Sequence, residues 1–237
     1  MTTFVLLHGG GMGGWTWKYV REILEARGHK VYTPTFTGFG EGNATHVRDI
    51  VNVFKYEDLR DVVLVAHSYA GTVAPGVIAE VGDRIASIIY LDAIVPRSGE
   101  RIGSLMGYVP EDQLAALDAM LEAGEGPVGS GVHEMQRAAA KEHPHLMDPA
   151  REKWLLDNLS DQPMKATACV IPVGAEAIDR PVDYIAAAVT VMTAMHDRAR
   201  ELGWTIHDHP GDHALLVGDP EGTTDLILKI SGAGAPA

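Results

Sequence analysis

The stretch "VVLVAHSYAGTV", residues 62–73, places a serine where a buried strand gives way to a helix. Val62–Ala66 is a continuous apolar run, typical of a strand covered on both faces. Ser68 follows it, with the small residues Ala66 and Ala70 two positions away on either side. A sharp strand-to-helix turn strains the serine and tolerates only small neighbours, as in the nucleophile elbow G-x-S-x-G, whose outer glycines are alanines here. A second interpretation, in which Ser68 only caps a buried helix, stays open on this stretch alone.

Short apolar segments alternate with segments of helical periodicity on both sides of this stretch. Strands are expected at 3–7, 30–35, 61–66, 84–93, 182–189 and 204–209, and helices within 15–28, 46–56, 193–203 and near 219–231. Such an alternation predicts βαβ units and a mostly parallel sheet, an α/β fold. Ligands of these sheets bind at the carboxyl ends of the strands, the edge that holds the loops after Leu7, Ala66 and Leu91.

The alternation stops between Pro96 and Pro163, where no segment has the character of a strand. Helical segments joined by glycine and proline replace it, at 110–124, 132–143 and 149–160. A helical insertion at the ligand-binding edge of a sheet acts as a lid. We therefore expect one domain over residues 1–237, with a helical lid at about 97–163.

Composition and charge restrict the partners of the chain. Its 237 residues include 19 Lys and Arg against 32 Asp and Glu, a net charge of −13, which disfavours nucleic acid and anionic membranes. Cys169 is the single cysteine, so no internal disulfide forms and a reducing compartment is favoured. The first residues have neither the basic region of a signal peptide nor an apolar run of membrane-spanning length. We expect a cytoplasmic protein that acts on a small molecule, and leave a homodimer open.

Three segments in order resemble one family. "LLHGGGMGGWTW" (6–17), "LVAHSYAG" (64–71) and "PGDHALLVGDPE" (210–221) are similar to the α/β-hydrolase superfamily, and more narrowly to its methylesterase and hydroxynitrile-lyase group. The opening H-G-x-x-x-G-G-W-x-W and "YLDAIVPRSGE" (90–100) resemble bacterial esterase-like members. The resemblance covers essentially the whole chain, although the insertion matches only in kind. It implies a parallel sheet flanked by helices, with a helical lid.

The resemblance also assigns roles to residues. Ser68 becomes the nucleophile, and its hydroxyl needs a base within hydrogen-bond reach. His213, in the last loop before the final helix, is the candidate base, in the chain order serine, acid, histidine. The backbone N–H groups of Gly10 and Tyr69 are the candidate oxyanion hole, each donor being worth about 10²–10³-fold in rate. His67 is expected to turn away from the serine hydroxyl and to pack or line the pocket.

The acid is where the sequence departs from its relatives. The family usually places it after the strand that follows the lid, and here Val189 and Thr190 stand there. Asp92, after the strand at 84–93, lies at the same edge of the sheet and could orient the Nδ1 proton of His213. Asp197 is a second candidate, and a site without an acid is a third. We assign Asp92 and leave the other two open.

Two other motifs suggest different chemistry. The glycine-rich 9–14 lacks the G-K-[ST] of a phosphate loop and the dinucleotide pattern, so no cofactor is expected. "HDHPGDH" (207–213) is similar to the zinc signature H-x-H-x-D-H with one extra residue. That signature normally lies near the start of its domain with further ligands downstream. We expect no metal, with His207 and His209 facing solvent on a strand.

The reaction follows by comparison with members of the superfamily. Hydroxynitrile lyases of this group need a threonine after the first histidine and a lysine after the catalytic one, whereas this chain has Gly9 and Ala214. Haloalkane dehalogenases and epoxide hydrolases use an aspartate nucleophile, which Ser68 replaces. Hydrolysis of a carboxylic ester or lactone remains. The alternatives are a small-molecule receptor with the same pocket, and a lyase or cyclase that uses His213 as a general base.

The substrate pocket is expected between the sheet edge and the lid. Apolar and aromatic residues near that edge are its candidate lining, namely Met12, Trp15, Leu105, Met106, Tyr108 and Trp154. Because methionine-rich walls adapt to many shapes, the sequence indicates an apolar or aromatic substrate without identifying it.

Overall fold

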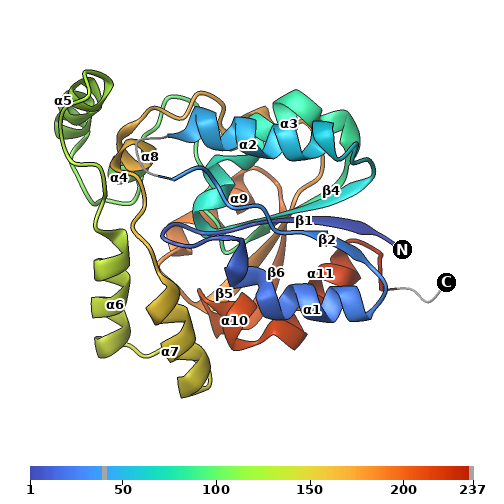
Figure 1. Ribbon diagram of the computed structural model, residues 1–237. Coiled ribbons are helices and arrows are strands. Elements are labelled where there is room, and N and C mark those ends of the chain that lie inside the picture. The colour runs from blue at the N-terminus through green and yellow to red at the C-terminus, as the bar shows by residue number, and fades with distance from the viewer. Residues whose placement is uncertain (39–41, 235–237) are drawn as a thin grey trace.

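A six-stranded parallel sheet forms the centre of the molecule (Figure 1), and the computed structural model describes residues 1–38 and 42–234. The strand order is β2-β1-β3-β4-β5-β6, and each neighbouring pair is parallel. The strands are β1 (Thr3–Leu7), β2 (Lys30–Tyr32), β3 (Val62–His67), β4 (Ile85–Leu91), β5 (Asp183–Val189) and β6 (Thr205–Asp212). The α/β class predicted from the sequence is confirmed.

Helices cover both faces of the sheet (Figure 1). On one face lie α2 (Asn43–Tyr56), α3 (Ala74–Val81) and α9 (Thr193–Glu201), and on the other α1 (Lys18–Ala26), α10 (Leu215–Gly218) and α11 (Pro220–Ile230). Short 3₁₀ helices occur at Gly14–Trp17, Ser68–Thr72, Gly82–Arg84 and Ala175–Ala177. Two hydrophobic cores result, one on each face.

The surroundings of β3 explain why its sequence is continuously apolar and does not alternate between apolar and polar residues. Val62, Leu64 and Ala66 belong to the core under α2 and α3, whereas Val63 and Val65 belong to the core under α1 and α11. Successive side chains of a strand point to opposite faces, and here both faces are buried. This central strand carries Ser68 at its carboxyl end.

Two strands, β2 and β6, end three residues away from their predicted ends. β2 ends at Tyr32, not at residue 35, because the chain turns away before Pro34, which has no N–H for a ladder. β6 continues to Asp212 instead of ending at 209, with a register shift opposite Ala187 and Val189. The backbone N–H of His213 then donates to the carbonyl of Val189 at 3.1 Å. The longer strand therefore delivers His213 to the carboxyl edge of the sheet.

Five helices separate β4 from β5. They are α4 (Ile102–Leu105), α5 (Glu111–Glu122), α6 (Val132–Glu142), α7 (Pro149–Asn158) and α8 (Met164–Ala168). In Figure 1, α5, α6 and α7 lie beyond one end of the sheet. The backbone N–H of Ser160, after α7, donates to the carbonyl of Gly11 at 2.9 Å and so ties this insertion to the loop after β1.

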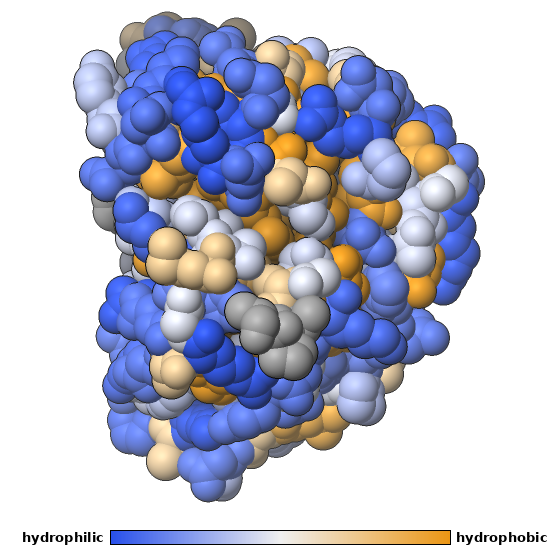
Figure 2. Space-filling model, turned by 90° about the vertical axis from the view of Figure 1, so that its right-hand side faces the viewer, coloured by the Kyte–Doolittle hydropathy of each residue, from blue (hydrophilic) through white to orange (hydrophobic). Residues whose placement is uncertain are grey.

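The face that carries the chain termini is mostly hydrophilic (Figure 2). Hydrophobic residues show there mainly in recesses between hydrophilic ones. Within residues 1–38 and 42–234, none of the helices is both long enough and apolar enough to cross a membrane.

Gly71 offers a test of the packing behind the serine turn. A Cβ at this position would stand 2.1 Å from the backbone oxygen of Ile94, which cannot move aside as a side chain can. We expect Gly71→Ala to lower the free energy of unfolding by about 3 kcal/mol. Urea unfolding followed by circular dichroism measures this, with Gly38→Ala as control because no described atom lies within 4 Å of the corresponding Cβ. Equal stability of the two variants would contradict the packing.

Candidate active site

Ser68 stands on a strained turn. It follows β3 directly, has a φ of 55°, and is 8% exposed. A left-handed backbone is uncommon for a residue other than glycine, and such strain concentrates at functional sites. A Cβ on Gly9 would stand 3.0 Å from the Cβ of Ser68, so the neighbouring loop must be small as well. α3 begins after Val73 without a side-chain cap, so Ser68 is not its N-cap.

His213 faces the serine. Its Nε2 lies 2.9 Å from Oγ of Ser68, and its Nδ1 lies 2.6 Å from Oδ2 of Asp92. An ionised carboxylate only accepts hydrogen bonds, so Nδ1 donates to Asp92 and Nε2 accepts from the Ser68 hydroxyl. The imidazole is thus held in the tautomer that can take the serine proton.

Asp92 is completely buried, at the end of β4, with a φ of 43°. Burial alone would raise the pKa of its carboxyl, but hydrogen bonds from His196, His213 and Thr190 outweigh burial and hold the pKa well below its usual range. The carboxylate is therefore charged at neutral pH and can stabilise a positive charge on His213.

The other proposed acid lies elsewhere. The side chain of Asp197 is 73% exposed and pairs with Arg200 on α9 at 2.8 Å. Thr190, where relatives usually have the acid, donates its hydroxyl to Oδ2 of Asp92 at 2.6 Å. The structure thus brings Asp92, and not Asp197, to His213.

The two predicted oxyanion-hole residues border the same cavity as Ser68 and His213. Tyr69 follows the serine, and Gly10 lies in the loop after β1. A Cβ at position 10 would stand 2.0 Å from Oε1 of Gln162, so a larger residue there would displace the end of this side chain. The Gln136 side chain on α6 donates to the carbonyl of Gly10 at 3.3 Å. The insertion therefore bonds this loop at two points, from Gln136 to Gly10 and from Ser160 to Gly11.

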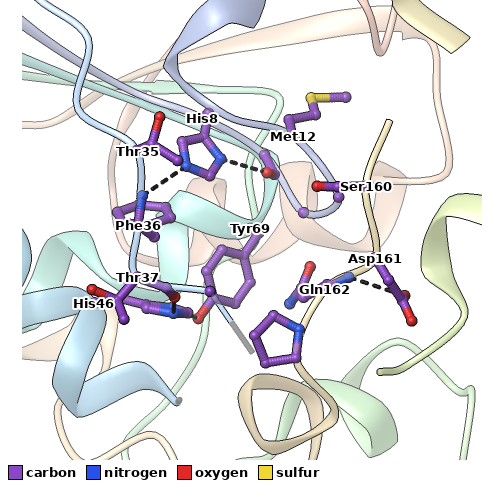
Figure 3. Close-up of a pocket in the computed structure, with 15 residues that line it drawn as sticks. His8, Met12, Thr35, Phe36, Thr37, His46, Tyr69, Ser160, Asp161 and Gln162 are labelled. Atoms are coloured by element: carbon purple, nitrogen blue, oxygen red, sulfur yellow. Dashed lines mark hydrogen bonds between the residues drawn. The ribbon is translucent and has the colours of Figure 1, made fainter. Parts of the chain in front are cut away.

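Hydrogen bonds of His8 and His46 support this loop and Tyr69 (Figure 3). The Tyr69 hydroxyl donates to Nδ1 of His46 at 2.6 Å, because Nε2 of His46 donates to the carbonyl of Thr37. His8 accepts the Phe36 N–H at Nε2 and donates to the Gly9 carbonyl through Nδ1. Burial lowers the pKa of His8 to about 4, so it stays uncharged. These residues line a small cavity of about 140 Å³ beside the loop.

His67 is turned away from the serine hydroxyl. It is fully buried, and its Nε2 donates to the backbone carbonyl of His213 at 3.0 Å. Burial and the nearby His213 lower its pKa to about 3. His67 therefore packs beside the site as a neutral residue and helps to hold the backbone of His213.

The cavity at Ser68 has a volume of about 430 Å³. Among the described residues that line it, none is Lys, Arg, Asp or Glu. Its walls come from the sheet edge and from α4, α6 and α8, and are formed by Gly10, Ser68, Tyr69, Ile94, Ile102, Met106, Tyr108, Val132, Met135, Gln136, Ala139, Gln162, Thr167, Val191, Met192 and His213. The site therefore suits an uncharged, largely apolar ligand.

The predicted pocket residues are only partly found there. Met106 and Tyr108 line the large cavity, while Met12 lines the small one. Leu105 packs against the hydrophobic core. Trp15 and Trp154 pack on each other with ring centroids 5.2 Å apart and border neither of these two cavities.

Sequence reasoning missed the walls contributed by α6 and by residues after β5. The helical periodicity around Val132 and Met135 was visible, but no signal showed which face would meet the sheet edge. Gln162 belongs to no recognisable sequence motif, although its side chain lies over Gly10 and it borders both cavities.

The prediction that His207 and His209 of β6 face solvent is wrong for His209. His207 is half-buried and bonds Asp183 at 2.7 Å. His209 does not face solvent, since it is 3% exposed and its Nδ1 accepts the backbone N–H of Gly211. His209 still pairs in register with Ala187, and its Nε2 lies 3.3 Å from Oδ2 of Asp219, the residue that precedes α11.

Comparisons with known proteins agree with the fold. The model of the Alpha/beta hydrolase family matches residues 4–226. A carbendazim hydrolyzing esterase of Nocardioides sp. (strain SG-4G) is 36% identical over 63% of this chain and 60% of its own length. A probable esterase of Oryza sativa subsp. indica is 24% identical over 96% of each chain.

Solved structures resemble the whole chain. An extracellular alpha/beta-hydrolase from a Paenibacillus species superposes with a TM-score of 0.78 at 21% identity, covering 97% of this chain and 99% of that one. A methylesterase from Arabidopsis superposes with a TM-score of 0.72 at 21% identity, covering 98% and 100%. These likenesses concern the fold, while the family match extends over nearly all of the sequence. The chain belongs to the alpha/beta hydrolase family.

Proposed function

We propose that this protein is a serine hydrolase that cleaves a carboxylic ester or lactone of a small apolar or aromatic substrate. The observation that carries the proposal is the continuous hydrogen-bonded chain from Ser68 through His213 to the buried Asp92. The esterases among its sequence relatives support ester hydrolysis as the reaction. The uncharged lining of the large cavity supports an uncharged substrate.

The geometry supports a two-step reaction. His213 takes the proton of Ser68 through Nε2 as Oγ attacks the substrate carbonyl carbon, and Asp92 stabilises the resulting imidazolium. The backbone N–H groups of Gly10 and Tyr69 bind the oxyanion of the tetrahedral intermediate. His213 then protonates the departing alcohol oxygen, which leaves an acyl group on Ser68. A water molecule, deprotonated by His213, attacks this acyl group, and collapse of the second intermediate returns the proton to Ser68 and releases the acid.

The insertion fits the role of a lid within a single catalytic domain. α6 supplies one wall of the large cavity through Val132, Met135, Gln136 and Ala139. Closing such a wall over a substrate excludes water from the reacting atoms. We also propose a reducing, cytoplasmic compartment, on the ground that Cys169 is the single cysteine of the sequence and forms no internal disulfide.

A fluorophosphonate probe tests the proposal directly. We expect rapid, stoichiometric labelling, with mass spectrometry locating the modification on Ser68. His213→Ala should lose the labelling. His207→Ala should keep it, because His207 pairs with Asp183 of β5 at 2.7 Å and does not line the cavity at Ser68.

The two alternative functions, a receptor and a lyase or cyclase, predict different results in such experiments. Tight binding of a small molecule by a folded, unlabelled protein would support a receptor with the same pocket. Turnover that survives Ser68→Ala but not His213→Ala would support a lyase or cyclase. Either result would overturn the serine-hydrolase proposal.

A further inference from the structure

Asp92 is held from two sides by different residues. Its Oδ2 accepts from His213 at 2.6 Å and from the Thr190 hydroxyl at 2.6 Å. Its Oδ1 accepts from Nε2 of His196 at 2.8 Å and from the backbone N–H of Ala187 at 3.2 Å. A fully buried carboxylate thus lies between two imidazoles, of which the mechanism above uses only His213.

His196 reaches the carboxylate from the first turn of α9. The Thr190 hydroxyl accepts the backbone N–H of Met192 at 3.0 Å, and the N–H of His196 donates to the carbonyl of Met192 at 3.1 Å. The amino end of a helix favours a nearby negative charge. The same short segment therefore aims two side-chain donors at Asp92.

The groups around His196 leave its ring little freedom. The side chain is 10% exposed, and its ring packs edge-on against Tyr184 of β5 with centroids 5.4 Å apart. The Tyr184 hydroxyl donates to the carbonyl of Ala93. The titratable groups that face the ring are Asp92 and Tyr184, with His213 beyond the carboxylate. His196 is therefore held in a position from which its ring donates a hydrogen bond to Asp92.

We propose that His196 is a positioning residue, which fixes the rotamer of Asp92 through Oδ1 and moderates the charge that Asp92 presents to His213. It does not line the large cavity itself, and its ring donates to Asp92 and not to Ser68, so its side chain acts on the site through Asp92. The inference gives His196 a part in the proposed ester hydrolysis and in that sense rests on it.

Loss of this donor has a defined direction. Without His196, Oδ1 keeps only the longer contact with Ala187, so the negative charge of Asp92 is less stabilised by donors and attracts His213 more strongly through Oδ2. The imidazolium of His213 is then more stable, and the pKa of His213 rises. Because catalysis requires neutral His213, the acid limb of the kcat/KM profile moves to higher pH. The carboxylate also gains rotational freedom, which lowers kcat.

The experiment compares His196→Ala with His196→Gln, whose carboxamide N–H can replace Nε2–H. For His196→Ala we expect the acid limb to rise by about 0.5–1 pH unit, the equivalent of one lost hydrogen bond, and kcat to fall about tenfold with KM nearly unchanged. His196→Gln should restore both to near the wild-type values. His207→Ala is the control, since it removes an equally short histidine–aspartate pair away from the site.

A purely structural role would lower Tm and leave the acid limb in place. An unmoved limb in His196→Ala, or equal damage in His196→Gln, would overturn the proposal. NMR titration of the His213 ring proton in each variant measures the same pKa change without turnover. If the wild-type protein hydrolyses no ester, the proposed function fails, while this titration still decides whether His196 acts on His213 through Asp92.

Discussion

Ser68→Ala should reduce ester turnover at least ~10⁴-fold, and His213→Ala should do the same. The serine variant loses the atom that forms the acyl-enzyme, and the histidine variant loses the base that activates this atom. Because the two act in one step, the double variant should be little worse than either single one. Steady-state hydrolysis of p-nitrophenyl and 1-naphthyl esters measures these losses.

The folded state must be unchanged for this comparison. Ser87→Ala, on β4, removes a hydroxyl away from the cavity and should retain full activity. Circular dichroism and Tm verify that Ser68→Ala is folded. Residual turnover within tenfold of wild type in a folded Ser68→Ala protein would refute the covalent mechanism.

The fold could be predicted because its signals are local. The apolar run of β3 and the small residues Ala66 and Ala70 around Ser68 follow from burial on both faces and from a tight turn. The lengths of β2 and β6 could not be predicted in the same way. Where they end depends on pairing with neighbouring strands, as the register shift opposite Val189 shows.

The sequence could predict those site residues whose position is set by the backbone alone. Ser68 and His213 follow strands, so the sheet edge brings them together. The choice between Asp92 and Asp197 depended on side-chain contacts across β4, β5 and α9, which no spacing in the sequence encodes. The wall formed by α6 depended on how a separate helical segment docks, and its contacts with Gly10 were equally invisible.

Asp92→Asn is the substitution that distinguishes the possible acids. It keeps the size of the side chain but removes the charge that stabilises the His213 imidazolium and selects its tautomer. We expect kcat to fall by about 10⁴-fold with little change in KM. Asp197→Asn is the matched control and should be nearly silent, because its carboxylate is exposed and pairs only with Arg200 among the described residues. The opposite order of effects would show that Asp92 is not the acid.

A second measurement separates the charge of Asp92 from its shape. Its pKa is lower in the folded protein than in the unfolded chain, so it contributes stability above the unfolded pKa of about 4, and this contribution is lost as the pH falls toward the folded value. Asp92→Asn should remove that part of the pH dependence of Tm between neutral pH and pH values below about 4. Asp197→Asn should leave it in place. A variant with wild-type acid sensitivity but impaired turnover would mean that the carboxylate orients His213 without being held as a charge, and that its four hydrogen-bond donors serve geometry alone.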